Sequence, residues 1–244
     1  MRRLRPDPAD TVDPLEVYGD PPTAEGRPGV RLNFVASADG AATVAGLSGG
    51  LASPGDRALF KTLRSLADVI LVGAGTVRAE GYGPPKLSDE AVAARERRGQ
   101  EPLPRIAVVS RSLVLDWQAP LFARPTSRPM VVAPADAPPD RLERAGELAE
   151  VVVAGSGSVD LPGALATLAG RGVRTVLCEG GPSLFGLLAA DGLVDELCLT
   201  VAPVLTVGGA RRIATGPSLP SPREMSLASV CEEDGFLFLL YRVT

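Results

Sequence analysis

Short apolar runs rich in β-branched residues alternate with helix-like segments along most of the chain, and this alternation limits the fold more than any other feature. Eight of these runs predict strands, at residues 30–36, 68–72, 105–109, 129–133, 150–154, 173–178, 194–202 and 235–243. Five intervening segments predict helices, at residues 54–66, 88–98, 139–148, 161–170 and 182–190. Strands that are apolar along nearly their whole length belong to parallel sheets covered on both faces. The pattern therefore predicts an α/β fold with a mostly parallel central sheet flanked by helices.

The helix expected at residues 54–66 has the clearest boundary signals. Ser53 suits an N-cap, Pro54 suits the first helical position, and Asp56 lies in the first turn. One face of this helix is apolar, with Leu59, Phe60, Leu63 and Leu66. This spacing is typical of a helix that packs on a sheet.

The last two expected strands, 194–202 and 235–243, have no helix between them, so we expect them to pair antiparallel near an edge of the sheet. The run FLFLLY at residues 236–241 would be prone to aggregation if it formed an exposed edge. We therefore expect a partner to bury this run.

Residues 1–28 differ from the rest of the chain in being rich in proline, mixed in charge and poor in apolar residues. We expect them to form an arm that lies on the surface or is partly disordered, with no part in function. Repeats and interior linkers are not evident in residues 29–244, which are therefore predicted to form one domain.

The chain contains no histidine among its 244 residues, which removes many enzyme classes. Ser-His-Asp and Cys-His catalytic pairs, HExxH zinc proteases and His-ligated zinc deaminases are all excluded. Lys61 and Lys86 are the only lysines, so Schiff-base chemistry is disfavoured as well. Proton transfer must then depend on a carboxylate, a tyrosine, water or a cofactor.

The three cysteines, Cys178, Cys198 and Cys231, are far apart and lie among apolar neighbours, so we expect core residues and no metal site. A net charge of −4 without a Lys/Arg-rich patch argues against a nucleic-acid partner. No apolar run has the length of a membrane span, and the N-terminus lacks a hydrophobic signal core. We expect a cytoplasmic protein that acts on a small molecule and binds neither nucleic acid nor membrane.

Two of the expected strands run into glycine-rich turns that precede a helix. Gly73-Ala74-Gly75-Thr76 follows the strand at 68–72, and Gly180-Gly181-Pro182-Ser183 follows the strand at 173–178. Glycine lets a ligand approach the backbone, and the N–H groups of a helix start favour a phosphate. For either turn alone, it is an equally good explanation that glycine only permits the backbone conformation of a strand-to-helix turn. Neither turn has the Rossmann spacing and no P-loop is present, so we expect two phosphate-binding loops at strand ends of another α/β fold.

Two further segments carry polar residues where a strand ends. Ser110-Arg111 follows the strand at 105–109 and could hold a phosphate, although an exposed loop arginine is the simpler interpretation. Residues 31–57 contain a polar set, namely Asn33, Ser37, Asp39, Ser48 and Ser53. Asn33 lies inside an apolar strand, so it needs either a hydrogen-bonding partner or a ligand. By composition alone, Asp39-Gly40 is simply a turn.

Four motifs occur in a fixed order: S-x-D-G at 37–40, LRSLADVILVGAGTVRAEGYGP at 63–84, VLCEGGPSLFGLL at 176–188 and LVDELCLTVAPVLTVGG at 193–209. Together they resemble the C-terminal reductase domain of riboflavin-biosynthesis enzymes, over about residues 29–243. GAGTVRAEGYGP is similar to the stand-alone pyrimidine reductase branch of that family. The resemblance implies a dihydrofolate-reductase-like fold, NADPH as cofactor and a homodimer.

The resemblance also implies a reaction, the reduction of 5-amino-6-(5-phosphoribosylamino)uracil to the ribitylamino compound by hydride transfer from NADPH to C1′ of the opened sugar. Bifunctional members of the family carry a zinc deaminase domain ahead of the reductase. With about 28 preceding residues and no histidine, this chain is expected to leave deamination to another protein. Two alternatives stay open: an NADPH-dependent reductase of a dihydrofolate, dihydropterin or other heterocyclic substrate, and a non-catalytic NADPH-binding regulatory protein.

The resemblance assigns roles to individual residues. Cofactor contacts are implied for Gly73, Gly75, Thr76, Glu80, Ser110, Arg111, Gly180, Gly181, Pro182, Ser183 and Leu184. Substrate contacts are implied for Asn33, Ser37, Ser48 and Glu179. Because histidine is absent, Asp39 is expected to be the catalytic polar partner or proton relay, with ordered water as the alternative. A substrate phosphate would be bound by Arg57, Arg64 or Arg78.

Overall fold

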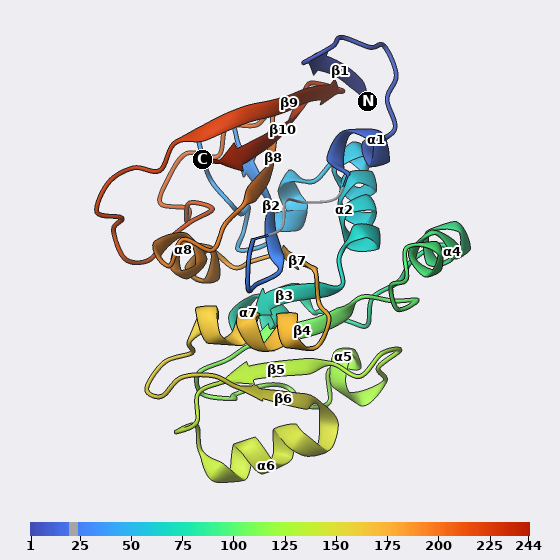
Figure 1. Cartoon of the computed structure of the whole chain (residues 1–244). Coiled ribbons are helices and arrows are strands. Elements are labelled where there is room, and N and C mark those ends of the chain that lie inside the picture. The colour runs from blue at the N-terminus through green and yellow to red at the C-terminus, as the bar shows by residue number, and fades with distance from the viewer. Residues whose placement is uncertain (20–23) are drawn as a thin grey trace.

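A computed structural model describes residues 1–19 and 24–244 (Figure 1). Its strands are β1 (Arg2–Arg5), β2 (Gly29–Ser37), β3 (Val69–Gly73), β4 (Arg105–Val109), β5 (Met130–Ala133), β6 (Glu150–Val153), β7 (Thr175–Cys178), β8 (Glu196–Ala202), β9 (Met225–Glu233) and β10 (Phe236–Val243). Its helices are α1 (Pro14–Tyr18), α2 (Pro54–Leu66), α3 (Ala74–Glu80), α4 (Asp89–Arg97), α5 (Pro120–Ala123), α6 (Pro139–Leu148), α7 (Leu161–Gly170) and α8 (Pro182–Ala190), with a 3₁₀ turn at Ser48–Leu51.

In the described part of the chain, the strands form one sheet in the order β1-β9-β10-β8-β2-β7-β3-β4-β5-β6. All neighbours from β8 to β6 are parallel, whereas β8, β10, β9 and β1 are joined by antiparallel pairing. The predicted fold class, a single mostly parallel α/β sheet with antiparallel strands near the C-terminus, is therefore confirmed. All eight predicted strands and all five predicted helices are present, with boundaries shifted by at most two residues.

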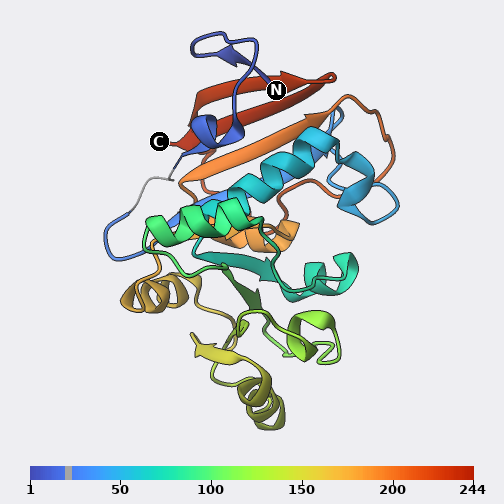
Figure 2. The same ribbon diagram turned by 90° about the vertical axis from the view of Figure 1, so that its right-hand side faces the viewer.

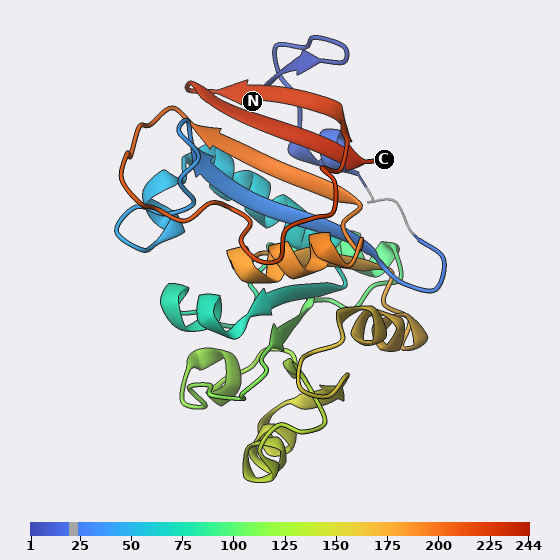
Figure 3. The same ribbon diagram turned by 90° about the vertical axis from the view of Figure 1, so that its left-hand side faces the viewer.

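Helices cover both faces of the sheet. Ile70 of β3 pairs with Leu177 of β7, so these two side chains lie on one face, where β3 to β5 pack on α5 and α6 and β7 packs on α2. The opposite face of the parallel strands packs on α7 and α8. Figure 2 shows α2 and α4 in front of one face, and Figure 3 shows α7 and α8 in front of the other. None of the helices among the described residues has the length and apolar character of a membrane span.

The signals that predicted α2 are confirmed in atomic detail. The Ser53 hydroxyl accepts a hydrogen bond from the backbone N–H of Asp56, as an N-cap does. Leu59, Leu63 and Leu66 are buried against the sheet. Phe60 is only partly buried, because its ring lies at the rim of the stripe and faces a cavity instead of the core.

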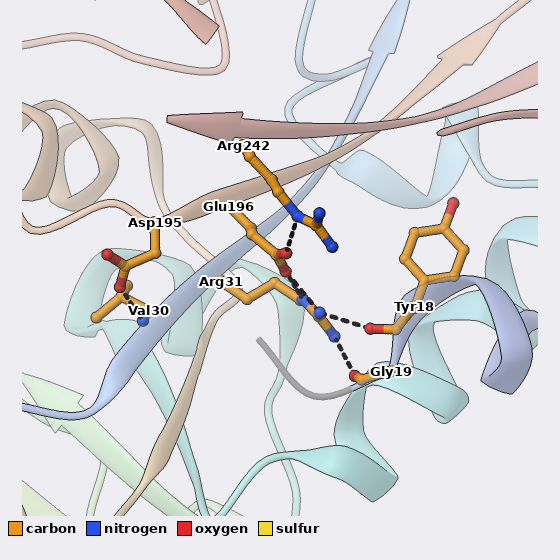
Figure 4. A network of polar contacts seen from close by, with 7 residues as sticks. All are labelled: Tyr18, Gly19, Val30, Arg31, Asp195, Glu196 and Arg242. Atoms are coloured by element: carbon orange, nitrogen blue, oxygen red, sulfur yellow. Dashed lines mark hydrogen bonds and ion pairs between the residues drawn. The ribbon is translucent and has the colours of Figure 1, made fainter. Parts of the chain in front are cut away.

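The N-terminal arm adds two elements that the sequence did not predict. β1 pairs antiparallel with β9 at the edge of the sheet, and α1 packs on α2 with Tyr18 buried. The guanidinium of Arg31 donates to the carbonyl oxygens of Tyr18 and Gly19, which ties α1 to β2 (Figure 4). The remainder of the expected arm includes Pro21 and Pro22, which lie outside the described residues. The arm's boundary at residue 28 stays a prediction.

The run FLFLLY is not at an edge. It forms most of β10, which pairs with β8 on one side, as predicted, and with β9 on the other. Phe238 and Leu240 are buried inside the chain itself. The expectation that a partner covers this run is therefore wrong, because β9, whose mixed polar sequence did not predict a strand, occupies the position beside it.

Candidate active site

A cavity of about 1130 Å³ opens where β2, β3 and β7 end, between α2, α3 and α8. Parallel α/β sheets bind their ligands at the carboxyl ends of the strands, so this is the expected place for a site. The volume exceeds the roughly 300–1,000 Å³ of a pocket for one small ligand. The cavity can therefore accommodate a cofactor and a substrate together.

The two glycine-rich junctions meet in this cavity. The backbone N–H of Gly73 donates to the carbonyl oxygen of Gly180 at 2.7 Å, which holds the start of α3 beside the start of α8. A Cβ atom on Gly181 would lie 2.5 Å from Oγ1 of Thr76, so a side chain at this position would have to displace the Thr76 hydroxyl. Among the described residues no side chain caps α3 or α8. Their first N–H groups are therefore available to an anion.

Glu179, directly before the second junction, is the centre of a buried cluster. Arg64 of α2 donates to it in a bidentate pair, Nε to Oε1 and Nη2 to Oε2, both at 2.7 Å. The Tyr82 hydroxyl donates to Oε2 at 2.8 Å. Burial, followed by the charge of Glu179, raises the pKa of Tyr82 well above its ordinary value, so the hydroxyl keeps its proton at neutral pH. The Arg64 guanidinium also lies 4.2 Å from the centre of the Phe60 ring.

Glu80, at the end of α3, is hydrogen-bonded to the start of the 3₁₀ turn at Ser48–Leu51. Its Oε1 accepts a hydrogen bond of 2.9 Å from the backbone N–H of Ser48, and both residues line the cavity. Ser48, predicted as a substrate contact, and Glu80, predicted as a cofactor contact, therefore lie side by side in the cavity wall. Because the bond runs to the main chain of Ser48, the hydroxyl of Ser48 is left for other partners.

Asp56 and Asn33 are two further polar residues that line the same cavity. Asp56 lies in the first turn of α2, and burial raises the pKa of its carboxyl, an effect that the neighbouring Thr200 hydroxyl reduces. The Oδ1 atom of Asn33 is buried and, within residues 1–19 and 24–244, has no hydrogen-bond partner. The requirement seen in the sequence, that Asn33 needs a partner or a ligand, is therefore not met inside the protein.

Asp39 and Ser37 lie outside the lining of the cavity. The Ser37 hydroxyl donates to Asp39, and the backbone N–H groups of Thr206 and Val207 donate to the same carboxylate. These bonds, with that from Ser37 first and that from Val207 next, hold the pKa of the exposed Asp39 carboxyl well below its usual range. A carboxylate held ionised in this way does not supply a proton at neutral pH. The hydrogen bonds of Asp39 join two loops, and its role as catalytic polar partner or proton relay stays a prediction.

Ser110 and Arg111 also lie outside the cavity lining. The buried Ser110 hydroxyl accepts a hydrogen bond from the backbone N–H of Leu113 and shapes the turn after β4, while Arg111 is exposed. Of the three arginines expected at a substrate phosphate, only Arg64 lines the cavity. The remaining cofactor candidates, Gly73, Gly75, Thr76, Glu80, Gly181, Pro182, Ser183 and Leu184, do line it. Gly180 is not in the lining, but a Cβ atom on it would lie 3.6 Å from the ring of Phe34, which is.

Several lining residues were not predicted as site residues. Those with charged or aromatic side chains include Asp56, Phe60, Lys61, Tyr82, Lys86 and Arg211. The chain has two lysines, and both line the cavity. A residue type that is rare in the sequence could therefore have pointed to the site. Phe60 was misplaced because its spacing fits the apolar stripe of α2, and the wall of the cavity continues that stripe.

Comparison with known proteins agrees with this geometry. The family model described as the RibD C-terminal domain matches residues 28–235. A relative from Archaeoglobus fulgidus, named 2,5-diamino-6-ribosylamino-4(3H)-pyrimidinone 5′-phosphate reductase, is 35% identical over 161 residues, which are 63% of this chain and 69% of the relative. A relative of the same name from Methanothermobacter thermautotrophicus is 33% identical over 201 residues, 79% of this chain and 86% of the relative. A crystal structure of a pyrimidine reductase-like protein from Corynebacterium diphtheriae superimposes with a TM-score of 0.81 at 29% identity, covering 95% of this chain and 98% of that protein.

Proposed function

This chain belongs to the RibD C-terminal domain family, and on that premise we propose that it is the NADPH-dependent pyrimidine phosphate reductase of riboflavin biosynthesis. It would convert a ribosylaminopyrimidine 5′-phosphate into the ribitylamino compound. One observation carries the proposal: the two glycine junctions and the Glu179–Arg64–Tyr82 cluster, which are far apart in the sequence, border one cavity. The curated relatives are reductases of this kind by name.

The residues at the two junctions fit a phosphate-bearing cofactor. The close approach of Gly181 to Thr76 keeps side chains out of the space between α3 and α8, and α8 begins there with free N–H groups. Gly73, Thr76 and the loop from Gly181 to Leu184 would hold the cofactor. Bound NADPH would supply the hydride.

The chain's own residues would then position the substrate. Lys61 and Lys86 offer the cavity two flexible cations for the substrate phosphate, whereas Arg64 is already committed to Glu179. The bidentate pair fixes Glu179, so its carboxylate can orient a hydroxyl or amino group of the substrate without moving. Holding the two reactants in the correct geometry can contribute about 7–11 kcal/mol to a barrier in the best intramolecular models.

Two pyrimidines are candidate substrates, and they differ at C2. The sequence motifs led to 5-amino-6-(5-phosphoribosylamino)uracil, which carries an oxygen at C2. The relatives' name describes a compound with an amino group there. The proposal at this level is a ribosylaminopyrimidine 5′-phosphate.

The direct test is to incubate the purified protein with NADPH and each pyrimidine phosphate, following the loss of NADPH absorbance and the mass of the product. We expect consumption of NADPH with a gain of two hydrogens in the product, and none with dihydrofolate as the control. Repeating the assay with NADH tests the preference for the phosphorylated cofactor. Binding of NADPH without turnover of either pyrimidine would contradict the proposal.

A homodimer, which the family resemblance implied, is part of the proposal. Light scattering coupled to size-exclusion chromatography measures it directly, and a mass near 25.2 kDa, that of one chain, would contradict it.

A further inference from the structure

We propose that the chain has a second ligand site, which binds a small anion that carries phosphate groups. The site is a cavity of about 910 Å³ at the start of β3, β4 and β5, which we call the amino-end cavity. Its volume is within the roughly 300–1,000 Å³ of a pocket for one small ligand. The candidate active site lies at the carboxyl ends of the strands. Because no described residue lines both cavities, this proposal is independent of the proposed function.

Positive charge dominates the lining of the amino-end cavity. Among the described residues, six arginines line it, against two carboxylates, those of Asp68 and Glu101. The arginines are Arg95, Arg98, Arg105, Arg128, Arg171 and Arg174. They come from separate segments of the chain, so no basic run marks the site in the sequence. Because a cleft with low-dielectric walls focuses the field of its charges, this cavity should attract anions although the whole chain has a net charge of −4.

The carboxylates near the cavity leave most of this charge unpaired. In the described part of the chain, Arg105 and Arg171 are the only arginines of this set that form an ion pair, and both share Glu150. The others donate to main-chain carbonyl oxygens, namely Arg95, Arg98, Arg128 and Arg174. A carbonyl oxygen has no net charge, so these contacts do not neutralise a guanidinium. Asp68 is already hydrogen-bonded to the side chain of Gln100 and to two backbone N–H groups.

Arg95 shows most clearly that a partner is missing. Its side chain is buried and borders the cavity. Nε and Nη1 donate to carbonyl oxygens, but Nη2 is buried without a hydrogen-bond partner within residues 1–19 and 24–244. Burial lowers the pKa of this guanidinium to about 10, so it is still charged at neutral pH. Buried charges are normally paired, and an anion in the cavity would supply the counter-charge.

A phosphate group suits this arrangement. Guanidinium groups bind phosphate oxygens through two parallel N–H bonds, and a phosphate offers several oxygens with up to two negative charges. Arginines from α4, from the loop before β5 and from the loop before β7 can therefore contact one group from several sides. Leu103 and Val173 are half-buried and line the same cavity, where they can contact an organic part of the ligand.

The test is a calorimetric titration of the full chain with two probes, inorganic pyrophosphate and ADP. We expect the wild type to bind both. The double variant Arg128→Gln with Arg174→Gln should bind each probe about 10- to 100-fold more weakly, because charge-assisted contacts are lost. Both arginines are exposed, so the thermal unfolding of the free variant should match that of the wild type.

Arg97→Gln with Arg144→Gln is the matched control. It also removes two exposed arginines, and neither of them lines a cavity described above. The affinity for both probes should stay within about threefold of the wild type. The comparison of the two double variants separates a contact in the amino-end cavity from the general effect of lowering the charge of the chain.

The two probes also distinguish the sources of the phosphate. Tighter binding of ADP indicates a phosphate ester whose organic part contacts Leu103 and Val173, whereas equal affinities indicate an inorganic oligophosphate. Either result supports the site if the Arg128 and Arg174 variant loses it. Absence of binding to the wild type overturns the proposal. Binding that is equally strong in that variant also overturns it, since a probe in the active-site cavity would not depend on these arginines.

Discussion

Strand β2 carries two polar residues on the same face, and the fold treats them in opposite ways. Arg31 is buried and bonded: it donates to Glu196 and to the carbonyl oxygens of Tyr18 and Gly19 (Figure 4). Asn33, two residues further on, leaves an oxygen without a donor among the described residues and lines the cavity. The first network stabilises the fold, and the second is left open for a ligand.

The closed network joins elements from both ends of the chain. Glu196 of β8 also accepts a hydrogen bond from Arg242 of β10, and the neighbouring Asp195 binds Arg27 and the backbone N–H of Val30. Figure 4 shows Glu196 between Arg31 and Arg242, with Arg31 also reaching the carbonyl oxygens of Tyr18 and Gly19 and Asp195 beside Val30. Asp195 and Glu196 do not line the cavity, whereas Asp56 and Glu179 do. The contrast is therefore between polar residues that face only other parts of the protein and polar residues that face open space.

Arg31→Met has the largest expected effect, and it tests whether the network around Glu196 stabilises the fold. The substitution leaves Glu196 buried without its main partner, and removing one member of a buried pair costs about 3–5 kcal/mol. Urea unfolding should show this loss of stability, while turnover per folded molecule at low temperature stays within about twofold of the wild type. The double variant Arg31→Met with Glu196→Leu should recover part of the stability. A loss below about 1 kcal/mol for the single variant would show that the network is not structural.

Glu179→Gln tests whether the polar residues that line the cavity are needed for turnover. Because Glu179 lines the cavity and holds Arg64 and Tyr82 in place, we expect kcat/KM to fall by about 100-fold, equivalent to roughly 2.7 kcal/mol. Stability should fall much less than in Arg31→Met, since Arg64 borders the cavity and can be solvated there. Glu147→Gln removes an exposed pair with Arg144 and is the control without effect. Turnover within threefold of the wild type would contradict the role of Glu179.

Gly181→Ala tests whether NADPH binds at the two glycine junctions. The added Cβ would collide with Oγ1 of Thr76, so this hydroxyl must turn away or α3 and α8 must separate. NADPH should then bind about tenfold more weakly, equivalent to about 1.4 kcal/mol. Gly146→Ala is the matched control, because a Cβ on this helical glycine meets open space. A fluorescence titration with NADPH measures both. Equal affinities in the two variants would place the cofactor elsewhere.

Asp39→Asn has the smallest expected effect. We expect turnover within about twofold and unchanged NADPH affinity, because Asp39 joins two loops outside the cavity. The pKa of Asp39 is lowered in the folded state, so its ionised form stabilises the fold above the ordinary pKa of 3.8, and this contribution fades as pH falls. Thermal unfolding should show a small deficit of Asp39→Asn at pH 7 that shrinks in acid. A large loss of turnover would support the catalytic role predicted for Asp39.

Local patterns predicted the elements of this fold well where one physical cause dominates. The β-branched runs and the Ser53–Pro54 start of α2 appear as expected, because periodicity and capping act over a few residues. β1 and β9 were not predicted as strands, because they are more polar. They form strands through pairing, β1 with β9 and β9 with β10. The glycine junctions were visible as local motifs, but their contact at Gly73 and Gly180 was not.

The sequence by itself determined the kinds of elements, the absence of imidazole chemistry and the presence of two phosphate-type junctions, since each depends on composition or on neighbours in the chain. Only the tertiary structure decided which polar residues are saturated and which are open. Arg64 and Tyr82 meet Glu179 across 115 and 97 residues, and Arg31 meets Glu196 across 165. The order of the strands brings these groups together, and strand order depends on how the whole sheet packs and closes. For that reason Arg31 of β2 is bonded within the protein, whereas Asn33, two residues further on, faces the cavity.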